Sequence, residues 1–239
     1  MGTFHLNQNE DYLTVNEIGN KRFLMAVMDG CTMGIDSHFA STLIGKLLKK
    51  IAKEMDYKAF VEKKEDELEI LLKKVMQVLF DALQKLQYQL DLKREELLST
   101  LILGVVDLEA RNAEILTIGD GLVCCNHQEF EYEQDNHPDY LGYHLGVDFE
   151  VWYGSQKQRL SLESIEDLSI VTDGIFTFKR FDEGEYEELE AASVMDFLLK
   201  DKTWSDSQSM LQKKMRFMEK NYGLKPTDDL AIVRLVLGK

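Results

Sequence analysis

Cysteine, proline and long apolar runs are scarce in this chain of 239 residues. Its three cysteines, Cys31, Cys124 and Cys125, are too few for a disulfide scaffold and form no Cys-x-x-Cys pair, so a reducing compartment is the simplest interpretation. No apolar run is long enough to span a membrane, and the first residues lack the apolar core of a signal peptide. We therefore expect a cytoplasmic protein.

Linkers are also lacking. Only Pro138 and Pro226 supply proline, and no Gly/Ser-rich tract or repeat of fixed period divides the chain. A chain of this length can bury a sizeable core without disulfides. We expect one domain over residues 1–239.

Basic residues are outnumbered by acidic ones. There are 28 Lys and Arg against 43 Asp and Glu, which gives a formal net charge of −15. Such a chain is repelled by nucleic acid and by anionic membrane surfaces, so we expect neither as a partner. The acidic surplus leaves room for cation sites lined by carboxylates.

Hydrophobic periodicity predicts a β-hairpin followed by two long helices. Residues 12–17 and 23–28 are short apolar runs joined by a glycine-containing loop, which is typical of a hairpin. From residue 36 to 55, and again from 68 to 90, apolar residues recur at helical spacing. The stripe is wider than the seam of a coiled coil, which favours packing on a sheet over a coiled coil.

Strand patterns return after residue 94. Short apolar runs, often β-branched, predict strands at residues 99–106, 113–118, 122–126, 149–153 and 168–171. Two helices follow, near residues 189–200 and 206–221, with Gly223 as the C-cap of the second and a closing strand at 230–237. Hairpins and runs of strands favour antiparallel sheets covered by helices, an α+β fold, over an alternating parallel α/β fold.

Acidic residues recur at the predicted strand ends. These sites are Glu10-Asp11, Asp29-Gly30, Asp120-Gly121, Asp173-Gly174 and Asp228-Asp229. Because the end of one antiparallel strand lies beside the start of its neighbour, Asp29, Asp173 and Asp228 can converge at one sheet edge, where Glu10-Asp11 can join them.

Carboxylates gathered in this way repel one another and raise one another's pKa unless cations neutralise them. Hard oxygen ligands suit Mg²⁺ or Mn²⁺ rather than Zn²⁺. The alternative is that each Asp-Gly is only turn chemistry. That alternative explains any single motif well, whereas the whole set favours a metal site.

The order of the motifs resembles the metal-dependent protein phosphatase 2C family, from about residue 7 to residue 237. The motifs that carry the resemblance are Asn9-Glu10-Asp11, Asp29-Gly30, Ser99-Thr100, Gly119-Asp120, Thr172-Asp173-Gly174 and Asp228-Asp229. The resemblance implies an α-β-β-α sandwich of two antiparallel sheets with helices outside. It also implies a two-metal site at one edge of the sandwich that hydrolyses phosphoserine or phosphothreonine in a protein substrate.

The resemblance assigns a role to each carboxylate. Asp29 matches the residue that bridges the two Mg²⁺ or Mn²⁺ ions, and Gly30 would offer its backbone carbonyl to one of them. Asp173 and Asp228 would bind the second ion. The implied reaction is in-line attack by a metal-bridging hydroxide.

Three further acidic residues would support this pair of ions. Glu10 and Asp11 would hold metal-bound waters or orient ligands. Asp120, together with Asp173, matches the site of a third and weaker ion in many bacterial members.

The chain departs from the family pattern around the substrate. Residues 5–7 lack the Arg that usually grips the phosphate, so that contact is missing or supplied elsewhere, with Lys21 and Arg22 as candidates. Cys31 replaces the His that usually follows the first Asp-Gly, and a thiol is a poorer donor to the leaving alcohol. Asp229 stands where many members have Asn and competes with Asp228 as the ligand.

These departures leave two alternatives to an active protein phosphatase. One is a pseudophosphatase whose cleft binds a regulatory partner, and the other is a phosphatase of a small phosphorylated metabolite. The intact Asp29, Asp173 and Asp228 favour catalysis over the pseudophosphatase.

Overall fold

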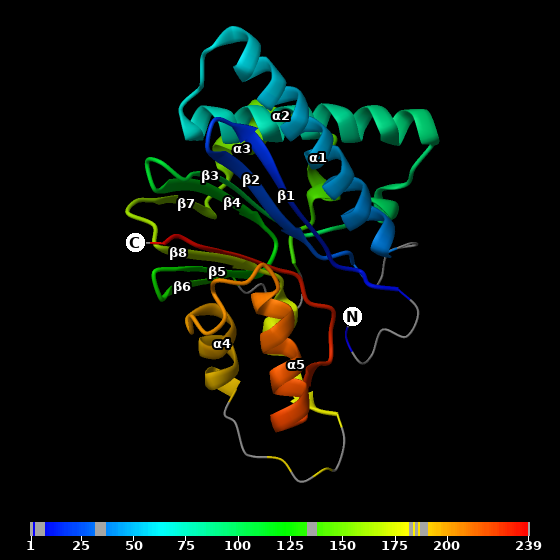
Figure 1. Cartoon of the computed structure of the whole chain (residues 1–239). Helices are drawn as coiled ribbons and strands as arrows, with labels where there is room; N and C mark the ends of the chain where they lie inside the picture. Colours follow the sequence, from blue (N-terminus) through cyan, green and yellow to red (C-terminus); the bar gives the residue numbers. More distant parts are fainter. Residues whose placement is uncertain are drawn as a thin grey trace.

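Two antiparallel sheets lie face to face between helical layers in the computed structural model of the chain (Figure 1). The structure describes residues 2, 8–31, 37–132, 138–181, 184, 186 and 191–238. The first sheet contains, in spatial order, β1 (Tyr12–Gly19), β2 (Arg22–Met28), β3 (Leu101–Asp107), β4 (Asn112–Ile118) and β7 (Arg159–Leu162). The second contains β11 (Ile232–Val236), β8 (Asp167–Val171), β5 (Gly121–Cys125) and β6 (Gln128–Tyr132).

Helices cover the outer face of each sheet (Figure 1). The first sheet carries α1 (Ser37–Glu62), α2 (Leu68–Leu90) and the short α3 (Phe149–Ser155). The second carries α4 (Ala191–Leu199) and α5 (Met210–Tyr222), which ends at Gly223 in the left-handed conformation, φ 62°. A two-stranded ribbon pairs β9 (Phe178–Arg180) with β10 (Leu224–Pro226). The α-β-β-α sandwich expected from the sequence is therefore confirmed.

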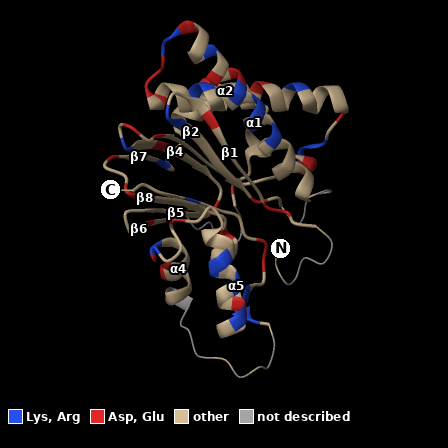
Figure 2. Cartoon of the chain, in the orientation of Figure 1, with Lys and Arg blue, Asp and Glu red and all other residues tan. Residues whose placement is uncertain are grey.

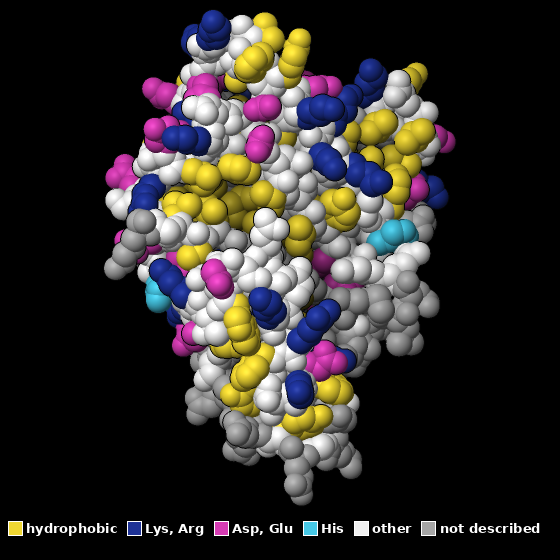
Figure 3. Space-filling view, viewed as in Figure 1, with side chains coloured by type: hydrophobic (Ala, Val, Ile, Leu, Met, Phe, Trp, Pro, Cys, Tyr) yellow, Lys and Arg dark blue, Asp and Glu magenta, His cyan; other side chains and the backbone are white. Residues whose placement is uncertain are grey.

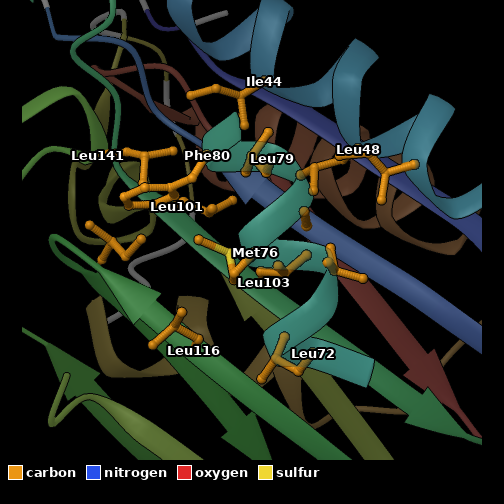
Figure 4. Close-up of a cluster of buried hydrophobic side chains, with 14 of the residues drawn as sticks. Ile44, Leu48, Leu72, Met76, Leu79, Phe80, Leu101, Leu103, Leu116 and Leu141 are labelled. Atoms are coloured by element: carbon orange, nitrogen blue, oxygen red, sulfur yellow. The ribbon is translucent and has the colours of Figure 1, made fainter. Parts of the chain in front are cut away.

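The helix stripes pack on the sheet as predicted. Ile44 and Leu48 of α1 and Leu72, Met76 and Leu79 of α2 are at most 2% exposed and join the core between these helices and the first sheet (Figure 4). Burying each such side chain stabilises the fold by about 1.5–3 kcal/mol relative to leaving it in water. The same burial rules out the coiled-coil alternative for these two helices.

A second core lies between the two sheets. Met25 and Val27 of β2 face Val123 of β5 and Ile170 of β8 across this layer, while Leu24, Ala26 and Met28 point to the helices on the other face. Because both faces of β2 are buried, its sequence is a continuous apolar run rather than an alternation.

The strand predicted at residues 149–153 is wrong, because this segment forms α3. The side chain of Asp148 accepts a hydrogen bond from the backbone N–H of Val151 and caps the helix. Phe149, Trp152 and Tyr153 are buried at helical spacing, whereas Val151 is 68% exposed. Strands β6 and β7 were not predicted, since both are short and largely polar.

Hydrophobic side chains gather in a band across the middle of the face seen in Figure 3. Leu13 and Val15 of the edge strand β1 are 45% and 49% exposed. None of the helices in the described part of the chain combines the length and the hydrophobicity needed to cross a bilayer. The three cysteines are buried and unpaired.

Candidate functional site

Acidic residues from both sheets converge at one end of the sandwich, between α1 and α5 (Figure 2). Asp11 directly precedes β1 and Asp29 directly follows β2, while Asp120 forms the turn from β4 into β5. Asp173 follows β8 after one residue, and Asp228 lies in the segment between β10 and β11. The convergence predicted from the strand ends is therefore present, and it includes Asp120.

Asp29 is the most strongly perturbed of these carboxyls. Burial, followed by the negative charges of Asp11 and Asp173, raises its pKa well above the ordinary value. A side-chain hydrogen bond joins Asp29 to Asp11, raising the pKa of Asp29 and lowering that of Asp11. Asp29 therefore keeps the shared proton when no cation is bound.

The neighbouring carboxyls are perturbed in the same direction. Burial raises the pKa of Asp11 to about 6, and the charges of Asp228 and Asp229 add to the effect. Burial also raises the pKa of Asp173 to about 7, aided by the charges of Asp120 and Asp228. Each ionised carboxylate in this cluster thus makes the ionisation of the next carboxyl less favourable.

Two of the Asp-Gly glycines lie where another segment of backbone approaches closely. A Cβ atom on Gly30 would lie 1.9 Å from the carbonyl oxygen of Ser37, at the start of α1. A Cβ atom on Gly174 would lie 1.8 Å from the carbonyl oxygen of Asp229. Turn chemistry alone therefore does not account for these two glycines, although Asp173-Gly174 also begins a short 3-10 helix in which Ile175 N donates to the Thr172 carbonyl at 3.3 Å.

The third motif does contain a turn. Gly119 and Gly121 have φ values of +89° and +129°, which disfavour any residue with a side chain. Asp120 lies between them, where the chain passes from the first sheet to the second. The turn conformation brings its carboxylate to the side of the cluster that holds Asp173.

Glu10 and Asp229 fasten the segment before β1. The Ser37 hydroxyl donates to Glu10 Oε1 at 2.6 Å, and the Ser41 hydroxyl donates to the Glu10 carbonyl at 2.5 Å. Asp229 is 1% exposed and accepts the backbone N–H groups of Gly2 and Glu10, both at 2.6 Å. Asp228 retains partial exposure, so between the two adjacent carboxylates Asp228 is the one placed to meet an ion from solvent.

Two threonines to which the sequence assigned no role form hydrogen bonds with these aspartates, Thr172 with the carboxyl group of Asp11 and Thr100 with the backbone of Asp29. Thr172 Oγ1 donates to Asp11 Oδ2 at 2.6 Å and accepts the backbone N–H of Ala231 at 2.9 Å. Thr100 Oγ1 accepts the backbone N–H of Asp29 at 3.2 Å. Both lie within motifs already noted in the sequence, yet no local signal gives the direction of a hydroxyl.

The proposed phosphate contacts of Lys21 and Arg22 are wrong. In the hairpin Tyr12 pairs with Met28 and Gly19 with Arg22, so the two basic residues lie at the opposite end from Asp29. At about 3.3 Å per residue the separation is roughly 20 Å. Arg22 instead donates to Asp107 Oδ2 at 2.8 Å. Residues 5–7, where the family Arg is lacking, lie outside the described residues.

The donor set fits a hard divalent cation. All the candidate donors are oxygens, and a bound cation would offset their mutual repulsion. Within the described residues, no three or more His, Cys, Asp or Glu side chains are grouped closely enough to hold a metal ion. Asp11 and Asp29 are instead held together by their shared proton.

The sequence is similar to one known protein family over most of its length. A sequence model of protein phosphatase 2C matches residues 1–222. No curated protein sequence is significantly similar.

Solved structures of low sequence identity share the fold. The phosphatase domain and regulatory fragment of the cell fate determinant SpoIIE from Bacillus subtilis has a TM-score of 0.55 at 19% identity. The match covers 99% of this chain and spans 60% of that one. The serine/threonine phosphatase Stp1 from Staphylococcus aureus has a TM-score of 0.60 at 13% identity, covering 100% of this chain and 93% of that one. RsbX in complex with magnesium has a TM-score of 0.53 at 13% identity. That match covers 98% of this chain and 90% of the RsbX chain.

Proposed function

This chain belongs to the protein phosphatase 2C family, and from that premise we propose that it hydrolyses phosphoserine or phosphothreonine in a protein substrate with the help of Mg²⁺ or Mn²⁺. The observation that carries the proposal is the convergence of Asp29, Asp173 and Asp228 at one end of the sandwich. The raised pKa values of Asp29 and Asp173 support a place where bound cations would replace protons.

Two divalent cations, bound here, would activate a water as hydroxide and stabilise the charge of the phosphoryl oxygens. Asp29 would be shared by both ions, the Gly30 carbonyl would contribute to one of them, and Asp173 and Asp228 would hold the other. The charges of Asp11, Asp173 and Asp228 all act on Asp29, which supports a role for its carboxylate as the shared ligand.

The remaining acidic residues support this arrangement. Asp11 is held by Thr172 and shares a hydrogen bond with Asp29, so it orients the bridging carboxylate. Glu10 fastens the start of α1 beside Gly30. Asp120, across from Asp173, would hold a third and weaker ion.

The test is metal-dependent hydrolysis of an aryl phosphate. We expect turnover with Mn²⁺ and none with chelator for the wild type, and none in either condition for Asp29→Asn. Asp81→Asn, an exposed change on α2, is the matched control and should keep wild-type turnover. An inactive wild type that still binds a partner protein would favour the pseudophosphatase instead.

Substrate class is tested separately. A phosphoserine or phosphothreonine peptide should be hydrolysed with higher kcat/KM than any small phosphorylated metabolite in a panel. The reverse order would favour the metabolite phosphatase.

A further inference from the structure

The proposed reaction leaves one chemical requirement unassigned, namely a proton for the oxygen of the departing alcohol. A seryl or threonyl alkoxide is a poor leaving group, so a neighbouring donor speeds its departure. Carboxylates that bind cations carry no proton and cannot serve. A neutral side chain with an O–H or S–H group beside the carboxylate cluster can serve instead.

Tyr140 lies at that position. It is 8% exposed and packs with Cys31 and Leu98, and its side chain is hydrogen-bonded to Cys31, the residue after Gly30. The phenol is also close enough to Asp29 and Asp120 for their charges to act on it. Burial, the contact with Cys31 and these two charges all raise the pKa of Tyr140, so the phenol is protonated at neutral pH and gives its proton only to a strong base such as a departing alkoxide.

The backbone holds this tyrosine in place. Leu141 N donates to the Ser99 carbonyl at 3.0 Å, and Tyr143 N donates to the Tyr140 carbonyl at 3.0 Å. A Cβ atom on Gly119 would lie 2.8 Å from the carbonyl oxygen of Asp139, so the glycine permits this segment to approach the Asp120 turn. A donor fixed in this way loses little entropy when it meets the substrate.

We infer that Tyr140 is a catalytic residue whose hydroxyl donates to the ester oxygen of the leaving seryl or threonyl group, an inference that rests on the proposed phosphatase function. The hydroxide oxygen bonds to phosphorus while the bond from phosphorus to the ester oxygen breaks. The ester oxygen leaves with its electron pair and takes the phenolic proton. Water then returns a proton to the tyrosine.

The test compares substrates whose leaving groups differ. A p-nitrophenolate leaves without help, whereas a seryl alkoxide needs a donor, so a lost donor changes the ratio of the two turnover numbers. For Tyr140→Phe we expect kcat on a phosphoserine peptide, relative to kcat on p-nitrophenyl phosphate, to fall by about 100-fold. Phe keeps the ring, and an unchanged melting temperature and Mn²⁺ affinity would exclude a folding defect.

Two further variants sharpen the outcome. Tyr143 is 44% exposed, and its ring packs edge-on to the Tyr140 ring with the two centroids 5.5 Å apart. Tyr143→Phe removes this neighbouring phenol and should leave the ratio of the two turnover numbers unchanged. Cys31→Ala removes the other proton-bearing side chain of the pair. A ratio that falls for Cys31→Ala and not for Tyr140→Phe would make the thiol the donor and overturn the inference.

The remaining outcomes separate this inference from the function on which it rests. An active wild type whose ratio is unchanged in Tyr140→Phe would overturn the role of Tyr140 and leave the phosphatase function intact. A wild type that hydrolyses neither substrate with Mn²⁺ would overturn both.

Discussion

Asp11 and Asp29 share a side-chain hydrogen bond although one precedes β1 and the other follows β2. The hairpin register, which pairs Tyr12 with Met28, brings the two carboxyls together at its open end. One proton between two acids is stable only while no stronger positive charge competes for the site. Under the proposed function, a bound cation would displace this proton.

The first prediction is that the metal-free protein loses stability as pH rises. Asp11 and Asp173 have folded pKa values of about 6 and about 7 against an ordinary value of 3.8, so the folded state binds more protons than the unfolded state between these limits. The contribution of these two groups to stability is full below about pH 4, and it falls by on the order of 7 kcal/mol as pH rises through 7. Urea unfolding in the presence of a chelator, at pH 5 and at pH 8, measures this change in the free energy of unfolding.

The matched measurement adds Mn²⁺. Saturating metal should remove most of the loss at pH 8, because the cation replaces the protons. A metal-free stability that rises from pH 5 to pH 8 would contradict the prediction.

The second prediction concerns Asp29→Asn. Asn cannot ionise, so at a pH high enough to remove the proton from Asp29 the substitution relieves the repulsion from Asp11 and Asp173, and the metal-free melting temperature should rise there. The same change should weaken Mn²⁺ binding and abolish turnover, since the bridging ligand is lost. Calorimetric titration and thermal melts in chelator test both effects, with Asp81→Asn as control. Retained Mn²⁺-dependent turnover in Asp29→Asn would sink the assignment.

The elements most accurately predicted are those whose burial sets a simple period. The predicted bounds of α2 coincide with those observed, because Leu72, Met76, Leu79 and Leu83 keep one face apolar along its length. Strand β2 was predictable because both its faces are buried. In each case the local sequence reflects one uniform environment.

Other features depend on contacts that are remote in sequence. Residues 149–153 show an apolar run suited to a strand, and only the cap from Asp148 and the packing of Trp152 on Phe80 make them helical. The close approach of Gly30 to Ser37 could not be inferred from Asp-Gly alone, which also begins turns. Likewise, Lys21 and Arg22 were near Asp29 in sequence but extended strand geometry carries them away.

The third prediction concerns Gly30→Ala. The new Cβ atom would lie 1.9 Å from the Ser37 carbonyl oxygen, so α1 must shift away from the site. We expect a loss of about 1–3 kcal/mol in unfolding free energy, together with reduced turnover. Gly146→Ala is the control, since nothing lies within 4 Å of a Cβ atom there. Equal urea midpoints for the two variants would mean that this close approach is not maintained in solution.

The fourth prediction follows from the position of the basic pair at the hairpin turn. Lys21→Ala and Arg22→Ala should leave KM for a small phosphate ester unchanged, because both lie roughly 20 Å from Asp29. Arg22→Ala should still lower the unfolding free energy, since it breaks the 2.8 Å ion pair with Asp107. Steady-state kinetics and urea melts on the same samples test both statements. A raised KM in either variant would place the phosphate near the hairpin turn after all.

The fifth prediction separates the metal sites. Asp120 faces Asp173 from the turn between the sheets, away from the hydrogen-bonded pair of Asp11 and Asp29. If Asp120 holds only a third and weaker ion, Asp120→Ala should keep two tight Mn²⁺ sites while lowering kcat. It should also lower the pKa of Asp173, because one repelling charge is removed. Calorimetric titration counts the tight sites, and Asp81→Asn again serves as control. Loss of a tight site in Asp120→Ala would instead place Asp120 among the ligands of the central pair.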